Sequence, residues 1–88
     1  MIVEFQSSFA RDLKTIRDAD LRSRIQSVIE SVEQAELLKD IPNLIKLQGG
    51  GGYYRIRVGN YRIGLFITEN IVTFIRCLDR REIYKSFP

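Results

Sequence analysis

Alternating apolar and polar residues between Tyr53 and Ile67 predict a β-hairpin. The alternation continues on both sides of Gly59-Asn60, a dipeptide suited to a two-residue turn. That turn sets a register in which Arg57 lies opposite Arg62. One face of the hairpin is then apolar, with Tyr54, Ile56, Val58, Tyr61, Ile63 and Leu65, and the other carries Tyr53, Arg55, Arg57, Arg62 and Phe66.

The N-terminal half of the chain predicts one strand and two helices. Residues 1–6 alternate as a short strand, and Ser7 or Ser8 supplies the N-cap of a first helix. A second helix begins near Asp18 or Asp20 and is expected to pair with the first as an antiparallel hairpin that covers a sheet. The apolar stripes are Phe9, Leu13 and Ile16 in the first helix and Leu21, Ile25, Val28, Ile29 and Val32 in the second.

The pattern weakens between the second helix and the hairpin. Pro42 ends a short helical turn, and Leu44 and Leu47 are expected to anchor this segment to the core. The run Gly49–Gly52 lacks the Gly-Lys-Ser/Thr ending of a phosphate-binding P-loop, so it predicts a flexible connector.

After the hairpin, Ile71–Leu78 reads as a further strand and residues 79–88 as a helical turn or irregular tail. The simplest register of this strand places Arg76 on the apolar face. An arginine is expected on that face only if it lies at the edge of the sheet. Ile83 and Phe87 of the tail are expected to point inward. The order β-α-α-β-β-β, with a helical tail, predicts an α+β domain over residues 1–88, in which two helices cover one face of a small antiparallel sheet.

Composition fits one small globular domain. The chain has 88 residues, 44% of them hydrophobic and 28% charged, and no apolar run approaches the roughly 20 residues that cross a bilayer. No N-terminal signal peptide is recognisable, so we expect a cytoplasmic protein without a membrane partner. The lone Cys77 fits a reducing compartment and is expected to be a buried filler.

Charge is distributed unevenly along the chain. Residues 1–44 hold six Lys or Arg and eight Asp or Glu, net −2, whereas residues 45–88 hold eight and three, net +5. The basic half contains the hairpin, and concentrated basic charge is typical of nucleic-acid binding. A solvated basic surface is the alternative. Because like charges directly opposite each other destabilise a sheet, Arg57 against Arg62 favours an anionic partner that removes the repulsion.

The segment Leu47–Tyr84, with YRIRVGNYRI, a strand and then RREIY, resembles the RelE branch of the RelE/ParE toxin superfamily. The predicted order of elements agrees along the whole chain, and the specific part is the doubled Tyr-Arg hairpin with the Arg-x-x-x-Tyr ending. The resemblance implies a small toxin that a co-expressed antitoxin neutralises in a hetero-oligomer. It also implies an endoribonuclease that cleaves messenger RNA on the ribosome without a metal or other cofactor.

The resemblance also implies roles for individual residues. Arg55 and Arg57 match the two basic positions of the first hairpin strand, and Arg62 matches an arginine that stabilises the scissile phosphate. Arg80 and Tyr84 match the C-terminal arginine and tyrosine. The implied catalytic residues are therefore Arg55, Arg62, Arg80 and Tyr84. The residues predicted to contact RNA are Lys46, Arg57, Arg81, Tyr53 and Phe66.

One departure concerns the acid and base. Many relatives carry histidine just before the C-terminal arginine, whereas this chain has Asp79 there and no histidine at all. Tyr84 either stacks on a base or acts as the general base, if nearby arginines lower its pKa from about 10. Arg80 would protonate or hydrogen-bond the leaving oxygen. Asp79 is an alternative base, or the carboxylate of a salt bridge beside Arg80.

Two questions stay open at this point. Tyr53 and Phe66 suit either stacking on RNA bases or contact with an antitoxin helix. The fold suits an endoribonuclease. It also suits a ParE-like toxin that inhibits DNA gyrase by binding, or an inactive module. The retained arginines and Tyr84 favour the nuclease, and the absent histidine counts against it.

Overall fold

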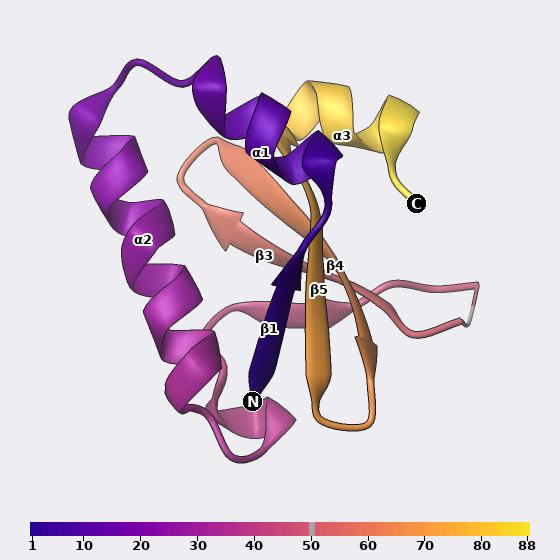
Figure 1. Cartoon of the computed structure of the whole chain (residues 1–88). Helices are drawn as coiled ribbons and strands as arrows, with labels where there is room; N and C mark the ends of the chain where they lie inside the picture. The colour runs from indigo at the N-terminus through magenta and orange to yellow at the C-terminus, as the bar shows by residue number, and fades with distance from the viewer. Residues whose placement is uncertain (50) are drawn as a thin grey trace.

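The computed structural model describes residues 1–49 and 51–88, where three α-helices pack with one five-stranded sheet of order β1-β5-β4-β3-β2 (Figure 1). Within these residues no helix has the length and apolar character needed to span a membrane. The predicted glycine connector includes residue 50, which lies outside the described residues. The elements are β1 (Ile2–Phe5), α1 (Ser7–Lys14), α2 (Ala19–Gln34), the 3₁₀ turn η1 (Leu38–Asp40), β2 (Leu44–Lys46), β3 (Tyr53–Val58), β4 (Tyr61–Thr68), β5 (Ile71–Asp79) and α3 (Arg80–Ser86).

The predicted hairpin forms as β3 and β4 in the expected register. Arg57 pairs with Arg62, and Arg55 pairs with Gly64. Gly59 has φ of +59°, as the first central residue of a type II′ turn requires. The apolar face supplies the centre of the core, where Ile56, Ile63 and Leu65 are fully buried.

The sheet differs from the prediction at both edges. β1 pairs with β5 in parallel, while all other neighbouring strands are antiparallel. β2 is an additional edge strand, which pairs Leu44 with Ile56 and Ile45 with Arg55. Its three residues are too few to show a period-two pattern, so the sequence did not reveal it.

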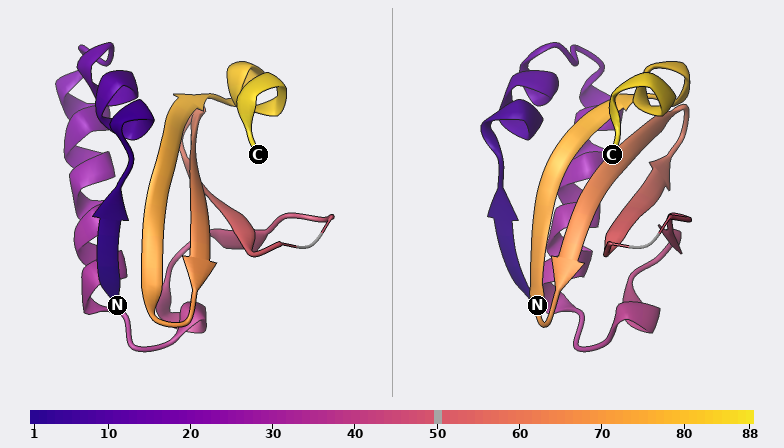
Figure 2. Two further views of the ribbon diagram at one scale, coloured as in Figure 1. Left: turned by 45° about the vertical axis from the view of Figure 1, so that its right-hand side comes forward. Right: turned by 90° about the vertical axis from the view of Figure 1, so that its right-hand side faces the viewer.

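The two longer helices lie on one side of the sheet, and α3 lies on the other (Figure 2). α1 packs mainly against β5, and α2 crosses the sheet against β1 and β3. The helices therefore share a face, as predicted, but they contact different strands. Helix α2 begins near Asp18, as predicted. Asp18 is its N-cap, since its carboxylate accepts from the backbone N–H groups of Asp20 and Leu21 at 2.9 and 3.2 Å.

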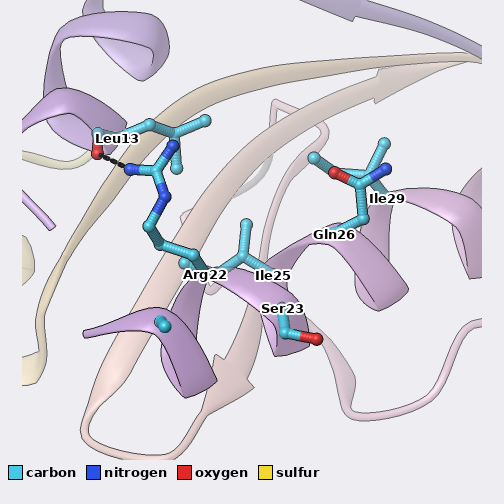
Figure 3. A pocket seen from close by; sticks show the side chains of 7 residues that line it. Leu13, Arg22, Ser23, Ile25, Gln26 and Ile29 are labelled. Atoms are coloured by element: carbon cyan, nitrogen blue, oxygen red, sulfur yellow. Dashed lines mark hydrogen bonds between the residues drawn. The ribbon is translucent and has the colours of Figure 1, made fainter. Parts of the chain in front are cut away.

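The cap predicted for α1 was wrong, because the N-cap residue is Gln6, whose side chain makes no cap hydrogen bond. At the other end of α1, Arg22 of α2 donates from Nη1 to the carbonyl oxygen of Leu13 at 2.8 Å (Figure 3). The same nitrogen also donates to the carbonyl oxygen of Ile16 at 3.1 Å. A guanidinium suits this position, where a helix leaves its carbonyls unpaired. Arg22 thus joins the two helices beside a hollow of about 420 Å³.

The edge of β5 is completed by side chains of α1 where β1 ends. β1 follows β5 only as far as Phe74. Beyond it, the Ser8 hydroxyl donates to the carbonyl oxygen of Ile75 at 2.6 Å, and the Cys77 N–H donates to Asp12 Oδ2 at 2.9 Å. Two side chains of α1 therefore replace the missing strand.

A β-bulge resolves the predicted conflict over Arg76. Gly64 pairs with Arg76 and Leu65 pairs with Phe74, which leaves Ile75 as an extra residue. Cys77, rather than Arg76, therefore enters the core, and burial raises the pKa of its thiol to about 12. The Arg76 guanidinium instead meets the Asp12 carboxylate with two hydrogen bonds, of 2.8 Å from Nε and 3.2 Å from Nη2.

We expect Asp12→Ala to lower the free energy of unfolding by about 2–4 kcal/mol, because it leaves the Arg76 charge and the Cys77 N–H unpaired. Urea denaturation followed by circular dichroism measures the change. Glu36→Ala, which removes an exposed carboxylate, is the control and should shift stability by no more than about 0.5 kcal/mol. Equal stability of the two variants would contradict a structural role for the pair.

Candidate nucleic-acid interface

Three arginines from the predicted hairpin gather on the face of the sheet opposite α1 and α2. Arg55, Arg57 and Arg62 line a hollow of about 270 Å³, together with Asn43 and Ile45. We call this hollow the arginine pocket. Arg57 and Arg62 are directly paired across β3 and β4, so the strand register itself places their charges together.

Arg62 is the most constrained of these arginines. Its Nη1 donates to the carbonyl oxygens of Gly59 and Tyr61, each at 2.9 Å, so the hairpin turn holds the side chain. The pKa of its guanidinium lies below the usual value, first because the group is partly removed from water and then because Arg55 and Arg57 are close. The arginine pocket is therefore a site of concentrated positive potential.

Tyr84 of α3 borders the arginine pocket. Its hydroxyl oxygen accepts a hydrogen bond from Arg55 Nη1 at 3.1 Å, and the Arg55 guanidinium carbon lies 5.9 Å from the centre of its ring. Tyr84 is 71% exposed. The hydrogen bond and the charge of Arg55 lower the pKa of the Tyr84 phenol, and Arg62 and Arg80 add smaller effects in the same direction.

The hairpin and the core hold α3 in place. The Arg80 N–H donates to the carbonyl oxygen of Asn60 at 2.8 Å, which ties the start of α3 to the hairpin turn. Ile83 is buried, as predicted, and Phe87 packs edge-on against Tyr53 with ring centres 5.6 Å apart. A Cβ on Gly64 would come within 2.8 Å of the Phe87 ring, so glycine at this strand position makes room for the tail.

Asp79 caps α3. Its carboxylate accepts from the backbone N–H of Arg81 at 2.9 Å and from Arg81 Nε at 3.2 Å. Both hydrogen bonds lower the pKa of the carboxyl group, because they stabilise its ionised form. Asp79 was predicted to be either a general base or the carboxylate of a salt bridge. The geometry supports the salt bridge, and its partner is Arg81.

The structure brings Arg55, Arg57, Arg62 and Tyr84 together, but other predicted site residues lie apart from them. Lys46 pairs with Tyr54 across β2 and β3, so it lies on the side of the sheet opposite Arg55. Arg81 is highly exposed and bound to Asp79. Tyr53 and Phe66 pack edge-on against each other, with ring centres 5.2 Å apart.

Three residues at this surface were not predicted from the sequence to belong to the site. Asn43 and Ile45 line the arginine pocket from β2 and the turn before it, and Phe87 covers Tyr53. Recognising β2 would have found Ile45, because it pairs with Arg55.

Comparison with known proteins agrees with this geometry. Residues 3–84 match the family described as the ParE toxin of the type II toxin–antitoxin system, parDE. The chain belongs to this toxin family. It is also 40% identical to Toxin RelE3 of Methanocaldococcus jannaschii over the full length of both chains, and 27% identical to Putative toxin RelE1 of the same organism over 96% of this chain and 94% of that one.

Solved structures of toxin–antitoxin complexes share the fold of this family member. The RelB–RelE antitoxin–toxin complex from Methanococcus jannaschii matches with a TM-score of 0.82 and 38% identity, over 97% of this chain and 99% of that one. The archaeal RelE–RelB complex from Pyrococcus horikoshii OT3 matches with a TM-score of 0.71 and 20% identity, over 90% and 93% of the two chains. The second likeness concerns the fold alone, and the RelE branch inferred from the hairpin and tail motifs is confirmed by the first and by Toxin RelE3.

We expect Tyr84 to ionise below the usual value of about 10, and Arg55→Met to raise its pKa by removing both the hydrogen bond and the positive charge. The ultraviolet absorbance of tyrosinate, with Tyr84→Phe subtracted, follows this group alone. Arg11→Met, a change on exposed α1, should leave the titration unchanged. An identical titration in the Arg55 and Arg11 variants would contradict the coupling.

Proposed function

We propose that this toxin is an endoribonuclease that cleaves messenger RNA on the ribosome. The observation that supports this most is the arginine pocket beside the Tyr84 hydroxyl, since it combines cations for a phosphate with a group that can exchange a proton. The likeness to Toxin RelE3 along the full length favours the same function. The whole chain would act as one toxin domain.

In the proposed reaction the RNA supplies its own nucleophile. A base removes the proton of the 2′-hydroxyl, the 2′-oxygen forms a bond to phosphorus, and the bond from phosphorus to the 5′-oxygen breaks. The leaving 5′-oxygen takes up a proton, so the products are a 2′,3′-cyclic phosphate and a 5′-hydroxyl. The chain must therefore supply a base, positive charge on the phosphorane and a hydrogen-bond donor for the leaving oxygen.

The arginines would supply the positive charge on the phosphorane and the hydrogen-bond donor for the leaving oxygen. Arg55 and Arg62 would hold the phosphate oxygens, because a planar guanidinium presents two parallel donors that match two oxygens. Arg57 lies opposite Arg62 and would add charge to the same pocket. Arg80, fixed at the start of α3, would donate to the leaving oxygen.

Tyr84 would be the base. Its hydroxyl accepts from Arg55, and this hydrogen bond stabilises the phenolate that must form before the proton is taken. Asp79 is a weaker candidate, because the Arg81 hydrogen bonds that lower its pKa also lower its basicity. Cleavage should therefore rise with pH up to the pKa of Tyr84.

The second candidate function is that of a toxin that inhibits DNA gyrase by binding it. The ParE description of the matching family is the observation that favours it. Binding alone needs exposed contact residues and no ionisable hydroxyl. The two functions therefore differ in what they require of the Tyr84 oxygen.

The toxin would be neutralised by a cognate antitoxin, as the RelB–RelE complex of the structural relative suggests. An acidic, flexible segment that folds on binding would cover the arginine pocket. Alternatively, the antitoxin would displace α3 and thereby move Tyr84 away from Arg55. The first mode blocks the arginine pocket, and the second removes the Tyr84 hydroxyl from it.

Primer extension on a translated message, with and without ribosomes, tests the proposed cleavage. We expect Arg62→Ala to reduce cleavage about 10²–10³-fold, because it removes a donor to the phosphorane. Tyr84→Phe should reduce it about 10²-fold or more, because the ring remains but the base is gone.

The controls separate chemistry from folding and stacking. Arg11→Ala removes an exposed arginine on α1, and Tyr54→Phe removes a hydroxyl from the opposite face of the hairpin; both should cleave like the unmodified chain. If Tyr84 only stacks on a nucleobase of the RNA, Tyr84→Phe keeps full activity and only Tyr84→Ala loses it. Growth arrest with intact message and inhibited gyrase would instead establish the second candidate.

A further inference from the structure

A second hollow adjoins the arginine pocket. It has a volume of about 230 Å³, and the residues around it are Leu47, Gln48, Arg55, Ile83, Tyr84, Phe87 and Pro88. Arg55 lines both hollows, and it donates a hydrogen bond to Tyr84, which lines the second one. A cationic pocket thus lies directly beside a mostly apolar one.

Three of the side chains that line this second hollow can stack on nucleobases. Tyr84 and Phe87 supply aromatic rings, and Arg55 supplies a guanidinium near the Tyr84 ring. Unpaired bases stack on such rings and on arginine planes. Aromatic stacking tolerates every base, so these walls provide affinity without base preference.

The hollow is also held open from both sides. The Leu47 N–H donates to the carbonyl oxygen of Tyr53 at 2.9 Å, which fixes one rim to β3. The Phe87 N–H donates to the carbonyl oxygen of Ile83 at 2.9 Å, and the Phe87 ring rests on Tyr53, which fixes the other. A preformed hollow of about 230 Å³ lies below the roughly 300–1,000 Å³ of pockets for drug-sized ligands, so its size suits a single flat base.

Gln48 differs from the rest of the lining. Its carboxamide offers both donors and an acceptor, and a glutamine can make two hydrogen bonds to one base edge. Among the groups around this hollow, it is the neutral side chain able to distinguish one base from another by hydrogen bonds.

We propose that this hollow, here called the base pocket, receives the nucleobase next to the phosphate held in the arginine pocket, and that Gln48 selects that base. RNA alternates charged phosphates with flat bases, and the two hollows alternate in the same way across Arg55. The inference rests on the proposed function for its substrate, single-stranded RNA. It adds a residue, Gln48, that determines sequence preference.

Fluorescence anisotropy with short 2′-O-methyl oligoribonucleotides tests this inference. The oligonucleotides differ in one base, and they cannot be cleaved because the methyl group blocks the 2′-oxygen nucleophile. We expect the unmodified toxin to discriminate among the four bases at one position by at least about fivefold, the factor for one good pair of hydrogen bonds. Gln48→Ala should bind all four about equally. Arg62→Ala should weaken all four while their ratio stays the same, and Leu47→Trp, which fills the hollow, should weaken all four and remove the preference.

The other outcomes are distinguishable. Equal binding of the four oligonucleotides by the unmodified toxin, or an unchanged preference in Gln48→Ala, would overturn the base pocket even if the toxin cleaves RNA. If Gln48→Ala instead weakens only antitoxin binding, the hollow holds a protein side chain and the inference is wrong. Base-selective binding without cleavage of a message translated on ribosomes would support the base pocket and contradict the proposed nuclease. Circular dichroism of each variant confirms folding, and exposed Gln48 has little effect on stability.

Discussion

The register of the β3–β4 hairpin is the constraint on which the candidate site depends. Glycine at the first position of the two-residue turn pairs Arg57 with Arg62 and Arg55 with Gly64. A shift by one residue would turn the apolar side chains outward and the arginines into the core, so burial of the apolar face fixes the arginines in place. The core therefore positions a set of like charges that repel one another.

The remaining elements bring the tail to these charges. Asp12 of α1 supports the edge of β5 beyond β1, and the bulge at Ile75 directs Arg76 to Asp12 rather than into the core. β5 then leads into α3, which the Asn60 carbonyl and the Asp79 cap hold at the hairpin turn. Tyr84 consequently reaches Arg55, which lies 29 residues earlier in the sequence.

The parts of the fold that follow from local pattern were predictable. The hairpin has alternating residues and a glycine turn, and α2 has a strong cap at Asp18 and a long apolar stripe. The bulge was not predictable, because it depends on a contact between Asp12 and Arg76, 64 residues apart. β2 was too short to recognise, and for that reason the face of Lys46 and the role of Ile45 were not seen.

We propose that the chain tolerates the repulsion between Arg57 and Arg62 because the pair binds phosphate. The free energy of unfolding of Arg57→Gln, measured in low salt beside its affinity for RNA, tests this most directly, with Arg57→Lys as the control that keeps the charge. We expect Arg57→Gln to be more stable by about 0.2–1 kcal/mol, salt to reduce this gain, and RNA binding to weaken. Lower stability of Arg57→Gln together with unchanged RNA binding would contradict it.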